Sequence, residues 1–457
     1  MSTAYDAIII GTGQAGPPLA ARLAEVGMNV AIVERKLFGG TCVNTGCIPT
    51  KAMVESAHAA YTARRGTEFG FASGPAVMDM KRVKARKDEA SARSRNGLEA
   101  WLKGMKNCTV YEGQARLTSP REVRVDGETL TSGQIFINVG ARAKIPAIAG
   151  LEQVPYLTNS SMIAVDSLPR HLMILGGSYI GLEFGQMFRR FGSEVTIIEL
   201  GPRLIAREDE DVSKAIREIL EGEGVKVRLN ANCVSLARRG EEIVARVDCE
   251  GGGEEICGSH LLVAVGRRPN TDDLGLDAAG VTVDEHAYIA VDDQLRTNVP
   301  GIWALGDCNG KGAFTHTSYN DFEIVASNLL DKGQRRVSDR IPTYALYIDP
   351  ALGRAGMTEA EVRATGKPAL RAKRPMSRVT RAALKGDTRG FMKVVADAET
   401  KLILGAAILG PNGDEIIHSV LDVMYAGKPY TLIERAMHIH PTVSELIPTM
   451  LESMEPM

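Results

Sequence analysis

The sequence contains two copies of one pattern, in which a short apolar run leads into spaced glycines, a helical stretch and a second apolar run. The first copy has an apolar run at 7–10, followed by three glycines and a terminal acid: Gly11, Gly13, Gly16 and Glu34. Two of the glycines allow a tight turn that a pyrophosphate can approach, and the third allows a helix to pack on the strand. The acid can accept ribose hydroxyls, so the pattern predicts a dinucleotide-binding βαβ unit.

The second copy keeps this order of parts, and its acid again lies 18 residues after the last glycine. Its glycines, first helical residues and acid are Gly176, Gly177, Gly181, Tyr179, Ile180 and Glu199. Ser178 replaces the middle glycine, and its side chain slightly hinders the backbone approach. Two such units in one chain predict two bound dinucleotides.

Composition excludes several classes of protein. The 54 Lys and Arg residues nearly balance 56 Asp and Glu residues, so the chain has no overall field for nucleic acid or an anionic membrane surface. No apolar run approaches the ~18 residues of a membrane span, and the N-terminus lacks a signal-peptide pattern. Seven cysteines are an odd number, too thinly spread for a secreted disulfide scaffold. We therefore expect a cytoplasmic protein, in which a persistent disulfide is usually catalytic.

The length of 457 residues fits about three domains. We predict an α/β fold with two Rossmann-like dinucleotide-binding domains and a final α+β domain. The predicted segments are 1–150 for the first domain, 151–270 for the second, 271–340 for a return to the first, and 341–457 for the last. In the last segment we expect strands at 391–396 and 402–409 and helices at about 414–425 and 443–454.

The strongest chemical motif is GGTCVNTGCIPTK at residues 39–51. On an ideal helix Cys42 and Cys47 would lie beyond the ~7 Å Cα separation that a disulfide tolerates. They can bridge only if the start of the helix is distorted, and Gly46 and Pro49 are suited to distort it. Half of a zinc site is one alternative, but no second Cys/His pair stands at ligand spacing. Two buried free cysteines are another, although they leave the glycines unexplained, and we favour a redox-active disulfide.

This motif, both glycine units and the C-terminal region resemble the class I flavoprotein disulfide reductases across essentially the whole chain. That family includes dihydrolipoamide dehydrogenase, glutathione reductase and mercuric reductase. Its pattern GGTCxNxGCxPxK is matched at every fixed position. The resemblance implies FAD on the first unit, NAD(P)H on the second, and a homodimer joined by the last domain.

The resemblance also implies roles for single residues. Cys42 would attack the substrate, and Cys47 would lie against the flavin as the charge-transfer thiol. Lys51 would lie near flavin N5 and pair with an acid that Glu183 matches. Tyr179 matches the tyrosine that gates the nicotinamide pocket in glutathione reductase.

Further flavin contacts are implied downstream. Residues 297–307 fit the second flavin motif of the family, in which Asp307 would hold the ribityl chain; an ordinary solvated aspartate is an equal alternative. His316 resembles a dihydrolipoamide dehydrogenase position near the flavin ring, with an ordinary helix-start histidine as the alternative. The usual Ala-Thr-Gly segment contains Val139 in place of threonine, so only Gly140 is carried over. The expected set is completed by Gly40 and Thr41 for FAD and by Gly266 for NAD.

The C-terminal region contains the sequence HPTVSE. A thiol nucleophile needs a base, and a histidine held by a carboxylate supplies one near neutral pH. The resemblance gives His440 this role and Glu445 the orienting role, with His440 reaching the disulfide of the other subunit. His438 is expected to be a supporting residue.

Glu199 also indicates which nicotinamide binds. A carboxylate at this position accepts the 2′-hydroxyl of NAD and repels the additional phosphate of NADP. Arg203 can soften the repulsion, but no arginine stands where NADP enzymes usually place one. We therefore predict that NADH is preferred to NADPH.

The substrate is less constrained. Mercuric reductases carry a further vicinal cysteine pair near the C-terminus, whereas no cysteine follows Cys308 here. We expect a small disulfide or dithiol substrate, as in dihydrolipoamide dehydrogenase, with a mercuric reductase-like Hg or Cu reductase as the alternative. A third hypothesis is a flavoprotein that serves a multienzyme partner, a lipoylated or acidic protein. We expect no resident metal ion.

Residues 371–393 contain eight Lys or Arg residues and a single acid, Asp387. Such runs are most often solvated faces. The sharper hypothesis is a docking surface for an acidic partner or an anionic disulfide.

Overall fold

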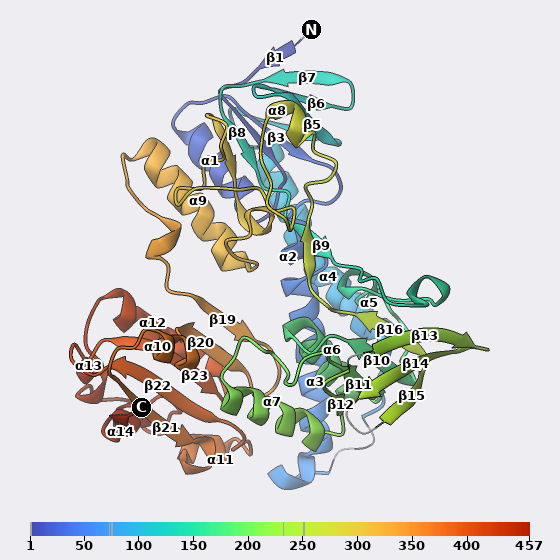
Figure 1. Cartoon of the computed structure of the whole chain (residues 1–457), viewed down its shortest axis with the longest axis vertical. Helices are drawn as coiled ribbons and strands as arrows, with labels where there is room; N and C mark the ends of the chain where they lie inside the picture. The colour runs from blue at the N-terminus through green and yellow to red at the C-terminus, as the bar shows by residue number, and fades with distance from the viewer. Residues whose placement is uncertain (1, 73, 75, 232, 250–251) are drawn as a thin grey trace. The chain divides into compact units, whose positions relative to one another are not determined.

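The computed structural model describes residues 2–72, 74, 76–231, 233–249 and 252–457. Contacts divide the chain into two units, and each unit draws on three separate segments (Figure 1). The first unit consists of Met1–Ala52, Lys84–Lys144 and Gly266–Arg340. The second unit consists of Met53–Val83, Ile145–Val265 and Ile341–Met457.

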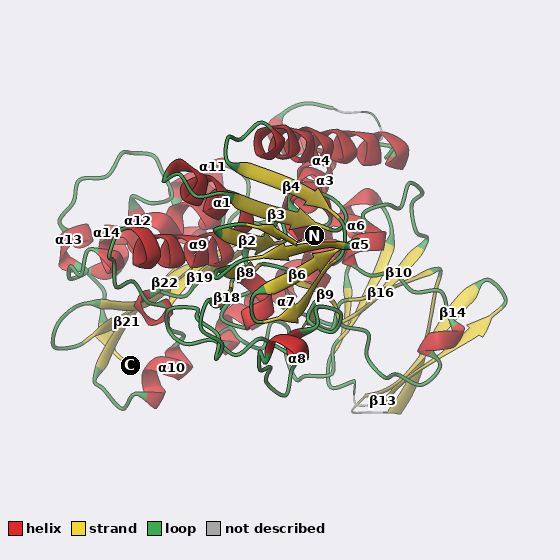
Figure 2. Cartoon of the chain, turned by 90° about the horizontal axis from the view of Figure 1, so that it is seen from above, coloured by secondary structure: helices red, strands yellow, loops and turns green. Residues whose placement is uncertain are grey.

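The first unit is built on a five-stranded parallel sheet with the strand order β18-β8-β2-β3-β4. Its strands are β2 (Ala7–Ile10), β3 (Val30–Glu34), β4 (Cys108–Glu112), β8 (Ile135–Ile137) and β18 (Ile302–Ala304). Figure 2 shows β4, β3, β2 and β8 side by side. The strands β2 and β8 are apolar and buried along their whole length, as in parallel sheets that are covered on both faces. The helices α1 (Gly16–Glu25) and α9 (Thr315–Leu330) contact each other.

A smaller sheet of this unit has the order β1-β7-β6-β5, and a further strand pair joins β9 to β17. The bounds are β1 (Ser2–Ala4), β5 (Ala115–Ser119), β6 (Glu122–Val125), β7 (Glu128–Thr131), β9 (Ala141–Ala143) and β17 (Arg267–Pro269). The unit also contains α2 (Gly40–Asn44) and α8 (Leu276–Ala279). Two long helices, α3 (Cys47–Arg64) and α4 (Met80–Lys103), each contribute residues to both units.

The second unit contains another parallel sheet, with the order β12-β11-β10-β16. Its strands are β10 (His171–Leu175), β11 (Glu194–Ile198), β12 (Lys226–Arg228) and β16 (His260–Val263), and its helices are α5 (Asn159–Met162), α6 (Tyr179–Phe191) and α7 (Glu210–Gly222). An antiparallel sheet lies within the same segment, made of β13 (Cys233–Arg239), β14 (Glu242–Cys249) and β15 (Gly252–Gly258). The βαβ order of both glycine units is thus present.

The C-terminal part of the second unit is a six-stranded antiparallel sheet with the order β19-β20-β23-β22-β21-β24. Its strands are β19 (Thr343–Leu346), β20 (Leu352–Gly356), β21 (Ala369–Pro375), β22 (Phe391–Asp397), β23 (Ile403–Leu409) and β24 (Glu455–Pro456). Its helices are α10 (Glu359–Ala364), α11 (Thr380–Leu384), α12 (Gly413–Tyr425), α13 (Thr431–Glu434) and α14 (Leu446–Leu451). The predicted fold class is confirmed.

One predicted helix is too long. The sequence pattern placed it at 443–454, whereas α14 covers only Leu446–Leu451. A helix that began at 443 would place Pro448 beyond its first turn, where the missing N–H would cost a hydrogen bond. Starting at Leu446 keeps Pro448 in the first turn, where no such bond is lost.

Within the described residues, no helix is both long and apolar enough to cross a membrane.

Candidate active site

The first glycine turn has the geometry that its sequence predicts. Gly11 has φ +105°, and a Cβ atom there would lie 2.3 Å from the Asn138 carbonyl oxygen. A Cβ at Gly16 would lie 2.2 Å from the Gly11 carbonyl oxygen, so α1 can begin here only at a glycine. At the end of β3, the Oε2 atom of Glu34 accepts hydrogen bonds from the Thr12 amide at 3.1 Å and the Thr12 hydroxyl at 2.5 Å. Turn and acid therefore form one rigid cradle.

Asn138 braces this turn, and sequence reasoning missed it. Its Oδ1 atom accepts from the Gly16 amide at 3.1 Å, and its Nδ2 atom donates to the Leu305 carbonyl at 2.9 Å. The signal was present in the sequence, because Asn138 directly precedes Val139 and Gly140 in the segment that departs from the family pattern. Gly140 itself has φ +65°.

Asp307 follows β18 and faces Arg267, a half-buried arginine of the same unit. The Arg267 guanidinium donates to Asp307 at 2.9 Å, and burial raises the pKa of Asp307 although the arginine charge opposes this. Among the described residues, the buried Nε atom of Arg267 has no hydrogen-bond partner. A glycine cradle that excludes Cβ atoms, a carboxylate and an unused buried donor fit the pyrophosphate and ribityl hydroxyls of FAD.

The second glycine turn repeats this geometry around Glu199. A Cβ at Gly176, which has φ +108°, would lie 2.5 Å from the Ala264 carbonyl oxygen, and one at Gly181 would lie 2.0 Å from the Gly176 carbonyl oxygen. The two carboxylate oxygens of Glu199 accept from the Gly177 amide at 2.6 Å and the Gly201 amide at 2.8 Å. These residues fit the adenosine side of a nicotinamide dinucleotide.

The backbone conformation accounts for two residues near this turn. Ser178, the N-cap residue of α6, has φ −103° and ψ −176°, an extended conformation that does not require glycine. Gly266 has φ +120°, which explains the glycine after the apolar run of β16. Tyr179 and Ile180 are the first two residues of α6.

The redox motif is a broken helix. The helix α2 ends at Asn44, Thr45 has φ −142°, and α3 begins at Cys47. A Cβ at Gly46 would lie 2.9 Å from the Thr41 carbonyl oxygen, so glycine is needed where the two helices meet. A Cβ at Gly40 would lie 3.1 Å from Gly13 Cα, which shows how closely this motif packs on the first glycine turn. The distortion that the cysteine spacing requires is present.

Cys42 and Cys47 are thiols in this structure, and they hydrogen-bond to each other. The Sγ atom of Cys47 lies 3.2 Å from the hydroxyl oxygen of Thr315, the first residue of α9. The hydrogen bond with Cys47 raises the pKa of Cys42, burial raises it further, and the Thr315 hydroxyl partly opposes both. Cys42 therefore needs a base to become a thiolate.

Sequence reasoning singled out His316 but missed its neighbour Thr315. The His316 ring stacks on Phe314, with ring centroids 5.3 Å apart and an interplanar angle of 8°. A hydroxyl at the first position of a helix is the signal that could have identified Thr315, because helix N-termini stabilise thiolates.

The predicted histidine–carboxylate pair is formed. The Nδ1 atom of His440 lies 2.9 Å from Glu445 Oε2, which leaves Nε2 as the basic nitrogen. The His440 side chain is 74% exposed, whereas Glu445 is 11% exposed. His438 donates from Nδ1 to the Ala436 carbonyl at 3.0 Å. An exposed imidazole is therefore held by a carboxylate that is largely shielded from solvent.

Glu183 is buried on α6, and its Oε1 atom accepts from the Tyr347 amide at 3.1 Å. Lys51 lies on α3 in the part of that helix that belongs to the first unit. The pairing of Lys51 with Glu183 stays a prediction.

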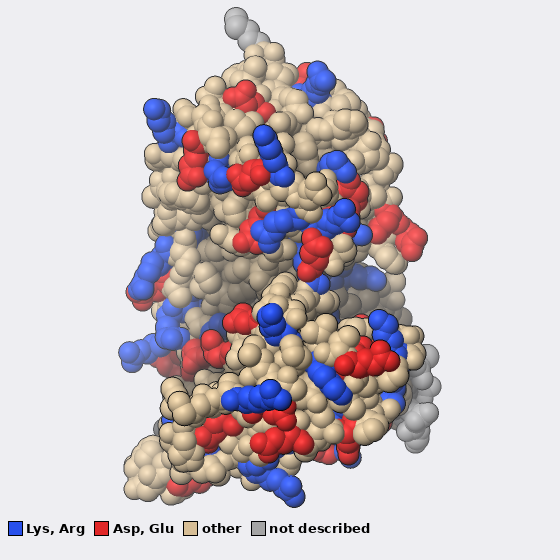
Figure 3. Space-filling view, turned by 90° about the vertical axis from the view of Figure 1, so that its left-hand side faces the viewer, with Lys and Arg blue, Asp and Glu red and all other residues tan. Residues whose placement is uncertain are grey.

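Half of the eight cations in the basic segment 371–393 form ion pairs with acids of the same unit. Four of its cations form ion pairs: Arg371 with Glu359 and Glu455, Lys373 with Asp211, Arg389 with Asp387 and Glu223, and Lys393 with Asp209, Asp211 and Glu359. On the face drawn in Figure 3, cations and acids are interspersed and neither sign dominates. Only part of the positive charge on which the docking-surface hypothesis depends is therefore available to a partner.

Lys393 also occupies a cluster of acids that has the spacing of a metal site. Its ammonium group, on a side chain that is 1% exposed, lies 2.8 Å from Asp209, 2.8 Å from Asp211 and 2.9 Å from Glu359. A buried cation already lies among these carboxylates, and Arg354, Lys373 and Arg371 each pair with one of them as well.

Comparison with known proteins places this arrangement in a family. Residues 5–321 match the family model "Pyridine nucleotide-disulphide oxidoreductase", and residues 342–451 match the dimerisation domain of the same family. The chain is 37% identical over 450 residues to the probable pyridine nucleotide-disulfide oxidoreductase RclA of Escherichia coli, covering 96% of this chain and 97% of RclA. It is 34% identical to dihydrolipoyl dehydrogenase of Thermus scotoductus (96% and 95% covered) and 33% identical to mercuric reductase of Streptomyces lividans (97% and 95% covered).

Solved structures agree. The HOCl-induced flavoprotein disulfide reductase RclA from Escherichia coli superposes with a TM-score of 0.90 at 36% identity, covering 98% of this chain and 100% of RclA. The Cu(II) complex of the same protein also gives 0.90 at 36% identity, covering 99% of each chain.

Proposed function

The chain belongs to the pyridine nucleotide-disulfide oxidoreductases, an FAD-dependent family of enzymes that use NAD(P)H, and we propose that it is an NADH-dependent reductase of a small disulfide. The observation that carries the proposal is the pair of thiols, Cys42 and Cys47, in a broken helix that packs on the first glycine turn. The local backbone structure does not require two cysteines at this helix break, whereas thiol–disulfide exchange requires two neighbouring thiols.

The residues supply the steps of disulfide exchange. When bound, FAD passes electrons from the nicotinamide to the Cys42–Cys47 pair. The Cys42 thiolate attacks one sulfur of the substrate disulfide, which forms a mixed disulfide and releases one substrate thiolate. Cys47 then attacks Cys42, releases the second thiolate and closes the Cys42–Cys47 disulfide. His440 takes the proton from Cys42 and gives it to the leaving thiolate, and Glu445 orients its ring.

Replacing the attacking sulfur tests this assignment. We expect Cys42→Ser to reduce disulfide turnover to background, because serine cannot form the mixed disulfide, while FAD remains bound at one per chain. Turnover is measured as NADH consumption under anaerobic conditions, and bound flavin by absorbance. Cys257→Ser is the matched control, because Cys257 is a free thiol in the second unit outside the motif. Undiminished turnover in Cys42→Ser would refute the assignment.

The preference for NADH rests on Glu199. Both of its oxygens are held by backbone amides, so the carboxylate cannot swing away from an added 2′-phosphate. We expect a higher kcat/KM with NADH than with NADPH, and we expect Glu199→Gln to narrow this ratio about tenfold by removing the repelling charge. Glu194→Gln is the control, since Glu194 is exposed at the start of β11. A higher kcat/KM with NADPH in the unmodified enzyme would contradict this reading.

Metal-ion reduction is a second candidate, favoured by the solved Cu(II) complex of a protein 36% identical to this chain. The two thiols of Cys42 and Cys47 offer soft ligands that suit copper and mercury. A panel of lipoamide, low-molecular-weight disulfides, Cu(II) and Hg(II), read by anaerobic NADH consumption, separates the two candidates. Turnover with the metal ions alone would replace the disulfide assignment.

We also propose a homodimer. Its support is the match of residues 342–451 to a dimerisation domain and the exposure of apolar side chains beside His440, where Met437 is 100% and Ile439 80% exposed. A partner that covers this surface would also cover the base.

A further inference from the structure

The segment between β19 and β20 is hydrogen-bonded along one face of α6. The Tyr347 amide donates to Glu183 at 3.1 Å. The Asp349 amide donates to Gln186 at 2.7 Å, and Gln186 donates back to the Asp349 carbonyl at 2.8 Å. Arg190 donates to the Asp349 carboxylate at 2.6 Å. Because Glu183, Gln186 and Arg190 are three and four residues apart, they share a helix face, and the segment fixes that face.

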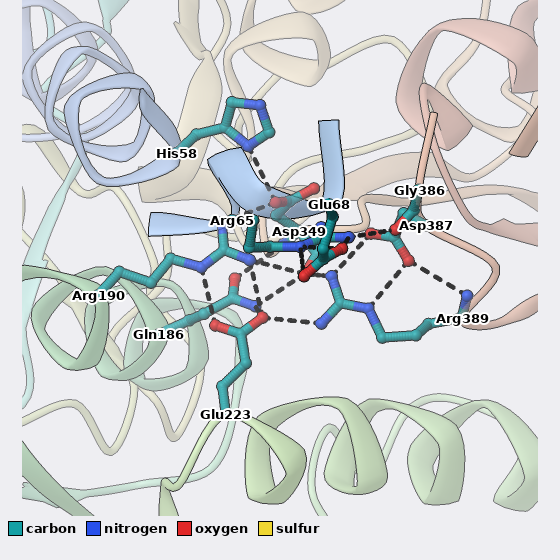
Figure 4. A network of polar contacts seen from close by, with 10 residues as sticks. All are labelled: His58, Arg65, Glu68, Gln186, Arg190, Glu223, Asp349, Gly386, Asp387 and Arg389. Atoms are coloured by element: carbon teal, nitrogen blue, oxygen red, sulfur yellow. Dashed lines mark hydrogen bonds and ion pairs between the residues drawn. The ribbon is translucent and has the colours of Figure 1, made fainter. Parts of the chain in front are cut away.

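Asp349 also binds a histidine of α3, so that one carboxylate joins two helices (Figure 4). The Nδ1 atom of His58 lies 2.9 Å from the Oδ2 oxygen that accepts from Arg190. Glu223 accepts two hydrogen bonds from Arg190, at 2.7 and 2.8 Å, and one from Arg389 at 2.8 Å. The side chains of Arg190 and Glu223 are 4% and 7% exposed, so salt screens their pairing only weakly.

The ring of Tyr61, one turn after His58 on α3, contacts the same cations. Its centroid lies 3.8 Å from the guanidinium carbon of Arg190, 5.3 Å from that of Arg65 and 6.0 Å from that of Arg389. Cation–π attraction therefore holds α3 against α6 beside the hydrogen bond of His58. Of these two contacts from α3, only that of His58 changes its charge near neutral pH.

The formal charges show what His58 adds. The network in Figure 4 contains four carboxylates, Glu68, Glu223, Asp349 and Asp387, and three guanidinium groups, Arg65, Arg190 and Arg389. With a neutral imidazole the network carries one excess negative charge. A protonated His58 balances it. The His58 side chain is 50% exposed, so solvent screens part of this charge, whereas the Arg190–Glu223 pair beside it is shielded from solvent.

Three charged groups act on the imidazole, one from each packed element: Asp349, Arg190 and, on α3 itself, Glu55. The hydrogen bond to Asp349 raises the pKa of His58 above its usual 6.5, although burial and Arg190 oppose this. Burial acts to raise the pKa of Asp349, but His58 and Arg190 outweigh it and hold that pKa well below its usual range. The link is thus complete below pH 6.5 and is lost as the pH rises through the raised pKa of His58.

We propose that Asp349 is a positioning residue that ties the face of α6 bearing Glu183 to α3, and that protonation of His58 strengthens the tie. The proposal rests on the proposed function, because it concerns the orientation of Glu183 in the NADH-dependent half of the reaction. Spacing supports it: Arg190 follows Glu183 by seven residues on α6, and His58 follows Lys51 by seven on α3, two helical turns in each case. The link therefore lies two turns beyond both expected flavin-side residues, on the same helix faces.

The test compares the Asp349→Asn holoenzyme with Glu242→Gln, which breaks an exposed ion pair with Arg170 in the same unit. Two readouts are needed. The first is the His58 titration by NMR, in which Asp349→Asn should return the pKa of His58 toward its usual value. The second is the stopped-flow rate of flavin reduction by NADH, which should fall about tenfold because small misplacements of a reacting group are costly. Reoxidation by a disulfide should be unchanged.

Variants at His58 test the charge itself and guard against misfolding of Asp349→Asn. The rate of flavin reduction should fall as the pH rises through the His58 pKa in the unmodified enzyme. His58→Gln should remove this pH dependence and give the slow flavin-reduction rate of the high-pH form at every pH. His58→Arg should also remove the pH dependence but give the fast rate of the low-pH form. If the His58 pKa responds to Asp349→Asn but neither the rate nor its pH profile changes, the network is only structural and the proposal is overturned. Absence of flavin reduction by NADH in the unmodified enzyme refutes the proposed function instead.

Discussion

At the scale of the single residue, the Thr315 hydroxyl affects how readily the motif cysteines lose a proton. It lies 3.2 Å from Cys47 and lowers the pKa of Cys42 against the opposing effects of Cys47 and burial. We expect Thr315→Val to raise the pH of half-maximal alkylation of the reduced protein by about one unit, because a hydrogen bond to a charged group contributes ~1.5 kcal/mol or more. The measurement is the rate of iodoacetamide labelling against pH.

Thr317→Val is the control for this variant. The Thr317 hydroxyl lies on the same turn of α9 but donates to the Phe314 carbonyl at 2.7 Å. An equal shift in both variants would show that disturbance of the helix start, and not loss of a thiolate donor, causes the effect.

Single residues also show where sequence reasoning ends. The motif predicted Cys42 and Cys47 directly, because each position of the pattern is chemically specific. Asn138 and Thr315 were missed because their partners, the Gly16 amide and a cysteine sulfur, lie 122 and 268 residues away along the chain. Such partners become neighbours only when the chain folds.

At the scale of elements, the break between α2 and α3 depends on Gly46. We expect Gly46→Ala to lower the free energy of unfolding by about 1–3 kcal/mol, because the added Cβ would lie 2.9 Å from a backbone oxygen that cannot rotate away. Gly97→Ala is the matched control, because Gly97 lies within α4 with nothing within 4 Å of an added Cβ. Alanine there should raise the free energy of unfolding by about 0.5–1 kcal/mol. Urea unfolding of the reduced proteins measures both, and equal effects would contradict the role of Gly46.

Elements were predicted where local pattern decides them and mispredicted where distant residues do. The strands at 391–396 and 402–409 and the helix at 414–425 lie within one residue of β22, β23 and α12. The predicted helix at 443–454 was too long because the prediction followed the apolar pattern and did not take the position of Pro448 into account. The basic segment 371–393 was interpreted as a solvated charged face because Asp209 and Asp211, which form ion pairs with Lys393, stand far earlier in the sequence.

At the scale of the whole molecule, the proposed base His440 is exposed, and it belongs to a different unit of the chain from Cys42 and Cys47. His440 is 74% exposed on the segment that also exposes Met437 and Ile439. A catalytic base needs a defined position and shelter from bulk water. In the proposed homodimer, a second copy of the chain related by two-fold symmetry would supply both at two equivalent sites.

Mixed dimers decide whether Cys42 and His440 act across the subunit interface. We expect Cys42→Ser and His440→Ala each to be inactive in disulfide reduction as pure dimers. A dimer with one subunit of each kind contains one site with an intact Cys42 and the partner chain's intact histidine, and one site that lacks both. It should therefore recover about half of the unmodified activity. If the two residues acted within one chain, neither site of the mixed dimer would be complete and activity would stay at background.

Differently tagged subunits, co-expressed and purified on both tags, give the mixed dimer, and anaerobic NADH consumption with a disulfide substrate measures the outcome. The control is a mixed dimer of Cys42→Ser with Cys42→Ser carrying both tags, which must remain inactive.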